Sequence, residues 1–270
     1  MLGSEFANSF EHLGTRFQAF NRDNFDLSGS TGTIAKQLMG FDLVLNCIAY
    51  TAVDRAESEW ELAEAVNATF PSKLATASSL NGFKLIHFST DYVFDGESST
   101  PYRTSDKRSP QNAYGRSKLL GENLIQESEA NYAIFRTSWL YGQFGSCFPK
   151  TISRLAQTKN EVTVVNDQHG QPTWTRDVVD LVATYFQTSC QERVVHATSS
   201  GSATWFDFAR EVTRSMGAEH ERKVVATTSD RFPLKAQRPK YSVLSHEDSQ
   251  LPPIGEWAAR WQIASNRVLA

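Results

Sequence analysis

The chain has 270 residues, of which 40% are hydrophobic and 21% are charged, and its formal net charge is −3 at pH 7. These values are typical of a globular protein with an ample core, and they give no basic footprint for nucleic acid or an anionic membrane. The three cysteines, Cys47, Cys147 and Cys190, are few, odd in number and far apart, so we expect reduced thiols in a cytoplasmic protein and no metal site. No apolar run reaches the roughly 20 residues of a membrane span.

The apolar pattern predicts helices alternating with strands over the first 140 residues. Leu2, Phe6, Phe10 and Leu13 recur at helical spacing, which predicts a helix over 2–13. The following segments are predicted as a strand at 16–20, a polar loop at 21–27, a helix at 31–39, a buried strand at 42–49, a helix at 57–80 with a kink or restart near Pro71, a strand at 84–90, a helix at 114–128 and a strand at 132–136. This alternation predicts an α/β fold with a doubly wound parallel sheet of the Rossmann type.

The alternation loosens after residue 142. The pattern here predicts helices at 148–158, 175–187 and around 205–212, strands at 162–165 and 193–197, and mostly short elements in the last 50 residues, which hold four prolines. We interpret 1–150 as a dinucleotide-binding domain and 151–270 as a smaller substrate-binding lobe, with about 175–200 returning to the first domain. Because open α/β sheets bind ligands at the carboxyl ends of their strands, we expect the lobe to cover that edge.

The beginning of the chain departs from a dinucleotide-binding fold, which normally opens with a strand, a glycine-rich turn and a helix. Here the helix comes first, and Gly3 is interpreted as the last glycine of such a turn. The missing strand would lie in the middle of the sheet, where each unpaired backbone group costs about 1–3 kcal/mol. We expect that the chain starts at an internal methionine of a longer natural protein; a cloning scar at 3–6 and a natural truncation are the alternatives.

Side chains suited to chemistry gather in two segments. The strand 84–90 ends in a hydroxyl-rich stretch that includes Thr90, and the helix 114–128 carries Tyr114 and Lys118 one turn apart on one face. A phenol beside an ammonium can donate a proton to a carbonyl that is being reduced by hydride, and Thr90 can donate a hydrogen bond to the same oxygen. A positive charge about 6 Å from the phenol would lower the pKa of Tyr114 by roughly two units. A tyrosine and a lysine four residues apart are more often just an exposed pair on a helix. Their position after the hydroxyl-rich strand end favours a catalytic site.

The chain from residue 2 onward resembles the extended short-chain dehydrogenase/reductase family, and within it the dTDP-4-dehydrorhamnose reductases. The resemblance rests on the segments 46–54, 89–96, 114–118, 136–142, 165–173 and 238–244, in this order. It implies NADPH-dependent reduction of the 4-keto group of dTDP-4-dehydro-L-rhamnose to dTDP-L-rhamnose, a step of nucleotide-sugar and polysaccharide biosynthesis, with NADH left open. By position it implies that Thr90, Tyr114 and Lys118 are the catalytic residues.

The resemblance also implies two binding regions. The cofactor residues are Gly3, Arg22, Asp26, Leu27, Ala49, Tyr50, Thr51, Tyr114 and Lys118. Asn21 stands where the family usually has an aspartate, which together with Arg22 favours NADPH over NADH. The substrate residues are Thr90, Asp91, Tyr92, Trp139, Gln168 and Arg238, with Pro172 and Thr173 in the same loop as Gln168.

The resemblance implies that Tyr92 and Trp139 face the deoxysugar and that Arg238 binds the diphosphate. Each of these roles has an alternative without a function. Trp139 would then be a core residue, Arg238 would pair with a carboxylate of the small lobe, and 49–51 would be an ordinary loop after a strand.

Two other functions remain open. The first is a non-catalytic NADP-binding protein, similar to the regulatory subunit of methionine adenosyltransferase. The second is an epimerase or dehydratase for another nucleotide sugar, although a dehydratase is expected to carry Asp-Glu where this chain has Asp91-Tyr92. We expect a small-molecule nucleotide sugar as the partner and neither nucleic acid nor membrane; a homodimer, and Mg²⁺ held by surface carboxylates between subunits, are left open.

Because the first strand and most of the glycine-rich turn are missing, we expect the chain as it stands to bind NADPH weakly or not at all. Titration calorimetry with NADPH measures this directly, and tight binding would contradict the expectation.

Overall fold

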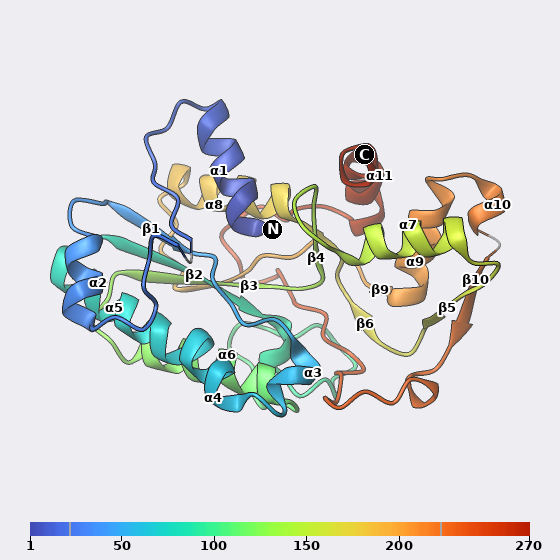
Figure 1. Cartoon of the computed structure of the whole chain (residues 1–270), viewed down its shortest axis with the longest axis horizontal. Coiled ribbons are helices and arrows are strands. Elements are labelled where there is room, and N and C mark those ends of the chain that lie inside the picture. The colour runs from blue at the N-terminus through green and yellow to red at the C-terminus, as the bar shows by residue number, and fades with distance from the viewer. Residues whose placement is uncertain (22, 222) are drawn as a thin grey trace.

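The computed structural model describes residues 1–21, 23–221 and 223–270. Arg22, which the resemblance assigns to the cofactor, therefore lies outside the described residues. A parallel sheet in the order β1-β2-β3-β8 forms one half of the molecule (Figure 1). Its strands are β1 (Leu43–Asn46), β2 (Lys84–Thr90), β3 (Tyr132–Thr137) and β8 (Val194–His196). The predicted α/β fold with a parallel sheet is confirmed.

Helices cover both faces of this sheet (Figure 1). One face carries α2 (Thr31–Gln37), α3 (Val53–Ala56), α4 (Trp60–Glu64), the π-helical turn η1 (Ala65–Thr69), α5 (Phe70–Asn81) and α6 (Ala113–Gln126); the other carries α1 (Leu2–His12) and α8 (Thr175–Gln187). Successive residues of β2 point to opposite faces. Leu85 accordingly packs in the cluster under α2 and α5, whereas Ile86 and Phe88 pack under α1 and α8.

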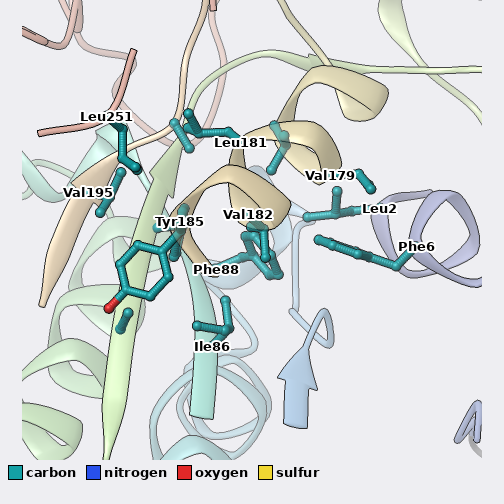
Figure 2. Close-up of a cluster of buried hydrophobic side chains, with 14 of the residues drawn as sticks. Leu2, Phe6, Ile86, Phe88, Val179, Leu181, Val182, Tyr185, Val195 and Leu251 are labelled. Atoms are coloured by element: carbon teal, nitrogen blue, oxygen red, sulfur yellow. The ribbon is translucent and has the colours of Figure 1, made fainter. Parts of the chain in front are cut away.

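Figure 2 shows how the α1–α8 layer is built. Leu2 and Phe6 of α1 and Val179 and Val182 of α8 surround Phe88 of the central strand β2. The Phe6 and Phe88 rings lie 5.6 Å apart between centroids. Burial of side chains of this size stabilises the fold by about 1.5–3 kcal/mol each, so the apolar face that predicted the first helix is what attaches α1 to the sheet.

The helix predicted over 57–80 is interrupted, and it restarts near Pro71 as predicted. Pro71 lies in the first turn of α5, directly after η1. Proline has no N–H to donate to the carbonyl four residues earlier, and its ring crowds that carbonyl, which here belongs to Asn67. The helix therefore widens into a π turn. The Asn67 carbonyl projects toward α6, where a Cβ on Gly121 would lie only 2.1 Å from it, so α6 needs a glycine at this contact.

The strand predicted at 16–20 is wrong. These residues form no ladder, and Phe17 and Phe20 pack instead on the rings of Phe10 and Phe25. In the described part of the chain, β1 pairs with β2 on one side only, and residues 16–20 do not add a strand to its outer edge. The strand predicted at 42–49 is present but shorter, and it is half-buried rather than buried on both faces because it lies at the edge of the sheet.

A second group of elements packs beside the carboxyl ends of the strands (Figure 1). It contains α7 (Phe148–Thr158), β5 (Val162–Val165), α9 (Trp205–Arg214), α10 (Ala218–Glu221), β10 (Val224–Thr227) and α11 (Trp257–Leu269). The helices predicted at 148–158 and 175–187 and the strand at 162–165 are confirmed, although β5 pairs with β10 in a small sheet of its own. The predicted strand at 193–197 is β8, which extends the main sheet next to β3. The division of the chain at residue 150 stays a prediction.

Short paired segments connect the two groups. β4 (Leu140–Tyr141) pairs with β7 (Thr173–Trp174), and β6 (His169–Gly170) pairs with β9 (Ala203–Thr204). No helix in the described part of the chain combines the length and the apolar character needed to cross a membrane.

The last 50 residues were expected to form mostly short elements. At their end, however, the chain forms α11, a helix of 13 residues. Its residues Trp257, Trp261, Ala264 and Val268 follow a helical period, which the four preceding prolines obscure. Trp261 is fully buried against Tyr141 and Phe208, and its indole N–H donates to the Glu211 carbonyl at 3.1 Å. The second group of elements therefore closes around the end of the chain.

Replacing Trp261 should show how much the packing of this group of elements depends on its side chain. We expect Trp261→Ala to lower the free energy of unfolding by about 3–5 kcal/mol, because it leaves a cavity in the core. Ile263→Ala on the same helix removes a side chain of a residue that is 59% exposed, and it should change little. Urea denaturation of both variants measures the difference; equal effects would contradict the anchoring role.

Candidate active site

The side chains predicted for chemistry on β2 and α6 meet at the carboxyl end of the sheet. Thr90 ends β2, and the 3-10 turn η2 (Asp91–Val93) follows it. Tyr114 lies in the first turn of α6, and its ring meets the Tyr92 ring edge to face, with centroids 5.9 Å apart and an interplanar angle of 74°. The structure therefore brings Thr90, Tyr92 and Tyr114 together as predicted from the resemblance; their roles stay predictions.

Two local features hold the start of α6 against the turn. Asn112 caps the helix by accepting the Gly115 N–H at 2.8 Å. A Cβ on Gly115 would lie 2.3 Å from the Tyr92 carbonyl oxygen, so only glycine allows this contact. The close approach sets the position of the Tyr114 ring relative to Tyr92.

Asp91 is a buried carboxylate that accepts hydroxyl donors from three segments. Thr90 Oγ1 donates to it at 2.9 Å, Ser138 Oγ at 3.0 Å, and Ser242 Oγ also donates. Burial raises the pKa of Asp91 to about 6, although the three hydroxyls oppose the rise. Because Thr90 donates to Asp91, its hydroxyl can donate to a substrate oxygen only after it turns away from this carboxylate.

The phenol of Tyr114 keeps its proton. Burial raises its pKa to about 12, the hydrogen bond with Thr90 opposes the rise, and the charge of Asp91 adds to it. The expected lowering of this pKa by Lys118 is therefore wrong for this structure, because burial sets the direction of the shift and Lys118 is not among the groups that move it. Such a phenol can donate its proton only to a strongly basic oxygen, which is what a carbonyl oxygen becomes when hydride is added to its carbon.

Lys118 is buried, and its Nζ contacts two residues of β2. Nζ donates to the Phe88 carbonyl at 2.6 Å and lies 3.3 Å from Nε2 of His87. Burial lowers the pKa of Lys118 to about 8, while the negative charge of Glu122 opposes this. The lysine therefore exchanges its proton closer to neutral pH than a free lysine does.

A buried ion pair attaches α6 to the sheet behind Lys118. Glu122 is completely buried, and its Oε2 lies 2.9 Å from Arg136 of β3 and 3.0 Å from Arg108. Burial is the largest influence and opposes ionisation, but Arg136, Ser89 and Arg108 together outweigh it, and the pKa of Glu122 is lowered. Removing one partner of such a pair typically costs about 3–5 kcal/mol, so the pair keeps α6 in one position on the sheet.

The predicted cofactor residues line the carboxyl end of β1. A Cβ on Gly3 would lie 3.4 Å from that of Cys47, so the start of α1 lies against the end of β1. Ala49 and Thr51 are exposed in the loop that follows, whereas the Tyr50 N–H donates to the Asn67 side chain at 2.9 Å. Open α/β sheets bind dinucleotides at this place.

The exposed loop 49–51, with Tyr114 and Lys118 nearby along the sheet edge, fits the nicotinamide half of such a cofactor. At the adenine half the fit is less direct. The Asp26 carboxylate accepts the Ser28 backbone N–H at 2.8 Å and its hydroxyl at 2.6 Å, and so closes a local turn. Leu27 packs against the core under α2.

Trp139 has an unusual backbone and a stacked ring. Its φ of +44° lies in the left-handed region, which bulky residues rarely adopt and which often marks a functional site. The indole stacks on Trp205 with centroids 3.6 Å apart and planes 8° apart. A Cβ on Gly170 would lie 2.5 Å from Cε2 of the same ring. One face of Trp139 is therefore covered by Trp205, and any sugar contact uses the remaining surface.

Arg238 pairs with Asp54 of α3 at 2.6 Å. Asp54 also accepts the Ala236 N–H at 3.1 Å, so the pair holds the C-terminal segment against the first group of helices. A pairing with a carboxylate was the alternative to diphosphate binding, but the carboxylate belongs to the first domain and not to the small lobe. Gln168 is buried between β5 and β6, and Thr173 bonds the Gln171 carbonyl at 3.0 Å.

Several neighbours of the site were not found from the sequence. Ser138 and Ser242 lie in the segments 136–142 and 238–244 that carry the resemblance, but no role was predicted for either serine. Trp205 was interpreted only as part of an amphipathic helix. Asn46 and His87 lie inside strands, where polar residues among apolar ones are the signal that could have found them. No group of three or more histidine, cysteine, aspartate or glutamate side chains within the described ranges is placed to hold a metal ion.

Comparisons with known proteins agree with this geometry. The sequence model of the family described as RmlD substrate binding domain matches residues 1–270. A Mycobacterium tuberculosis protein named dTDP-4-dehydrorhamnose reductase is 41% identical over 264 residues, which cover 95% of this chain and 86% of that protein. A Streptomyces antibioticus protein named probable dTDP-4,6-dihydroxy-2-methyloxan-3-one 4-ketoreductase is 36% identical and covers 100% of this chain and 93% of its own length. The crystal structure of dTDP-4-dehydrorhamnose reductase from Bacillus anthracis in complex with NADP superimposes with a TM-score of 0.90 at 31% identity, covering 97% of this chain and 94% of that one.

The raised pKa of Asp91 predicts a pH-dependent stability. Between its ordinary value of 3.8 and about 6 the folded state binds the proton more tightly than the unfolded state, so its contribution to stability grows as pH falls through this window. The gain is on the order of 2–3 kcal/mol. Asp91→Asn, whose amide can also bond the three hydroxyls, should lack this gain. Urea unfolding of both proteins at pH 4.5 and 7.5 measures it, and a constant difference between them would contradict the assignment.

Proposed function

The chain belongs to the RmlD substrate binding domain family, and we propose that it is an NADPH-dependent reductase of the 4-keto group of dTDP-4-dehydro-L-rhamnose. Its product would be dTDP-L-rhamnose, a nucleotide sugar for polysaccharide biosynthesis. The carrying observation is a half-buried phenol, Tyr114, that keeps its proton beside the Thr90 hydroxyl at the end of a parallel strand. Relatives with the matching name, and an NADP complex of similar fold, support the substrate and the cofactor.

Each residue of the site has a role in this reaction. A bound NADPH supplies the hydride, and the loop 49–51, Tyr114 and Lys118 would hold it. As negative charge develops on the substrate oxygen, Tyr114 donates its proton there, and Thr90 adds a hydrogen bond once its hydroxyl turns from Asp91. Lys118 stabilises the phenolate that remains. Tyr92 and the free surface of Trp139 contact the deoxysugar.

The diphosphate of the substrate competes with Asp54 for Arg238. The guanidinium lies 2.6 Å from Asp54, and a diphosphate offers more acceptor oxygens in the geometry that arginine binds best. Binding of the nucleotide sugar would therefore exchange one partner of Arg238 for another and leave Asp54 with backbone N–H donors such as that of Ala236.

A second candidate substrate is a related dTDP-linked deoxysugar ketone. The Streptomyces antibioticus relative, which matches the whole chain, bears the name of a 4-ketoreductase for a different sugar. The proton-donating residues serve either ketone, so the contacts of Tyr92 and Trp139 would decide between them. The ratio of kcat/KM for the two sugars distinguishes these candidates. The intact set Thr90, Tyr114 and Lys118 disfavours a purely regulatory protein.

We also propose that the protein works in the cytoplasm. All three cysteines, Cys47, Cys147 and Cys190, are free thiols, which suits a reducing compartment. A homodimer, with or without a bridging cation, stays a prediction that sedimentation measurements can decide.

The proton donor can be removed without changing the shape of the site. We expect Tyr114→Phe to lower kcat by about 10²–10⁴-fold, because the substrate oxygen loses its general acid. Oxidation of NADPH in the presence of the 4-keto sugar gives the rate, and circular dichroism checks the fold. Tyr132→Phe, which removes a phenol from the opposite end of β3, should leave kcat near the starting value. More than a few per cent of residual activity in Tyr114→Phe would refute the assigned role.

A further inference from the structure

A buried row of three polar side chains lies directly behind the proposed proton donor. Asn46 ends β1, His87 lies in β2 and Lys118 lies on α6, and their exposed fractions are 3%, 0% and 1%. Asn46 Nδ2 lies 3.0 Å from Nδ1 of His87, and Lys118 Nζ lies 3.3 Å from Nε2 of the same ring. His87 is thus the link between the first strand and the catalytic lysine.

Counting donors and acceptors settles how the histidine ring is protonated. A neutral imidazole has one N–H donor and one acceptor nitrogen. The Asn46 Oδ1 accepts the Ile48 N–H at 3.2 Å, so the amide turns its Nδ2 donor toward His87. Nδ1 of His87 must therefore accept, and the proton of the ring lies on Nε2. Burial and the neighbouring Lys118 hold the pKa of His87 well below its usual value, which excludes a doubly protonated ring.

This arrangement places an N–H in front of the lysine. An ammonium has three donors and no lone pair, so it cannot accept from Nε2–H, whereas a neutral amine can. The Phe88 carbonyl, 2.6 Å from Nζ, accepts from either form. His87 therefore favours the lysine form that has given up one proton.

Other charged groups around α6 do not reverse this preference. Glu122, on the next turn of α6, favours the ammonium, but it is shared with Arg136 and Arg108. The charged side chains on the elements packed against α6 have partners elsewhere. These pairs are Asp91 with three hydroxyls, Asp54 with Arg238, Arg55 with Glu59, Lys73 with the Gly29 carbonyl and Lys84 with Tyr185. On α4, Glu61 is exposed and Glu64 is half-buried. Asn67 of η1 is neutral and bonds Ser117.

We propose that His87, oriented by Asn46, is a positioning residue that presents an N–H to Nζ of Lys118 and so favours release of the Lys118 proton. The proton balance is simple. Tyr114 gives one proton to the substrate oxygen, and one proton from the solvent, passed on by Lys118, restores the phenol, so each turnover consumes one solvent proton. The catalytic consequence rests on the proposed reductase activity, whereas the state of the His87 ring does not.

The ring state can be measured in the cofactor-free protein. In ¹⁵N NMR spectra of histidine-labelled protein, His87→Gln identifies the signals of this ring by their loss. We expect Nε2 to carry the proton and Nδ1 to lack one across neutral pH. A proton on Nδ1, or a doubly protonated ring at pH 7, would overturn the proposal whether or not the protein reduces a sugar.

The consequence for Lys118 is read from the pH profile of kcat. In the starting protein we expect the alkaline limb near pH 8, where Lys118 loses its proton. In His87→Gln the side-chain carbonyl can accept from Nζ, so the limb should move upward by about one unit, a tenfold change in proton concentration. A merely structural role would lower kcat at every pH without moving the limb.

The matched control is His196→Gln. His196 is a second buried histidine of the same sheet, on β8, where its Nδ1 lies 2.9 Å from the Ser245 carbonyl. This variant removes an imidazole of equal size but has no contact with Lys118, so its alkaline limb should stay in place. Limbs that do not move in either variant, or that move equally in both, would refute the role of His87. If Tyr114→Phe also retained activity, the proposed function would fail while the NMR result would still stand.

Discussion

The carboxylate of Asp91 is the interaction on which the rest of the site depends. It receives hydroxyls from Thr90, Ser138 and Ser242, which come from the end of β2, the end of β3 and the C-terminal segment. A buried carboxylate without such donors would cost several kcal/mol, so the three segments have to meet there. Trp139 directly follows Ser138, and Arg238 lies four residues before Ser242. The predicted walls of the sugar and diphosphate sites therefore take their positions from one buried charge.

Burial, more than charge attraction, sets the proton chemistry. It raises the pKa of Tyr114 from 10.0 to about 12 and lowers that of Lys118 from 10.5 to about 8, so the two pKa values move apart. An acid that keeps its proton and a lysine that releases one easily suit successive proton transfers. Both groups stand on α6, which the Glu122–Arg136 pair and the glycine contact with Asn67 hold in place. The helix α6 thus carries both the contacts that stabilise the fold and the residues predicted to transfer protons.

The apolar periodicity was enough to predict a helix or strand wherever that element packs one face against another element of the chain. The helices at 148–158 and 175–187 and the strands at 84–90 and 132–136 appear where the pattern predicts them. Residues 16–20 fail because an extended segment becomes a strand only beside another strand, and local pattern does not report the partner. The helix holding Trp261 was missed because the prolines before it suggested irregular structure. In the site, the spacing of Tyr114 and Lys118 placed both on one helical face, whereas no role was predicted for Ser138, Ser242 and Trp205, because their contacts join segments far apart in the chain.

By itself the sequence determined the parallel α/β architecture and predicted which residues donate the proton, because these follow from short-range spacing and from motifs. Only the tertiary structure decided the direction in which the Tyr114 pKa moves, the partner of Arg238, the stacking of Trp139 on Trp205 and the contact of Lys118 with His87. Each of these depends on burial or on contacts between segments far apart in the chain. Desolvation and long-range hydrogen bonding are properties of the packed molecule, so no stretch of residues contains them.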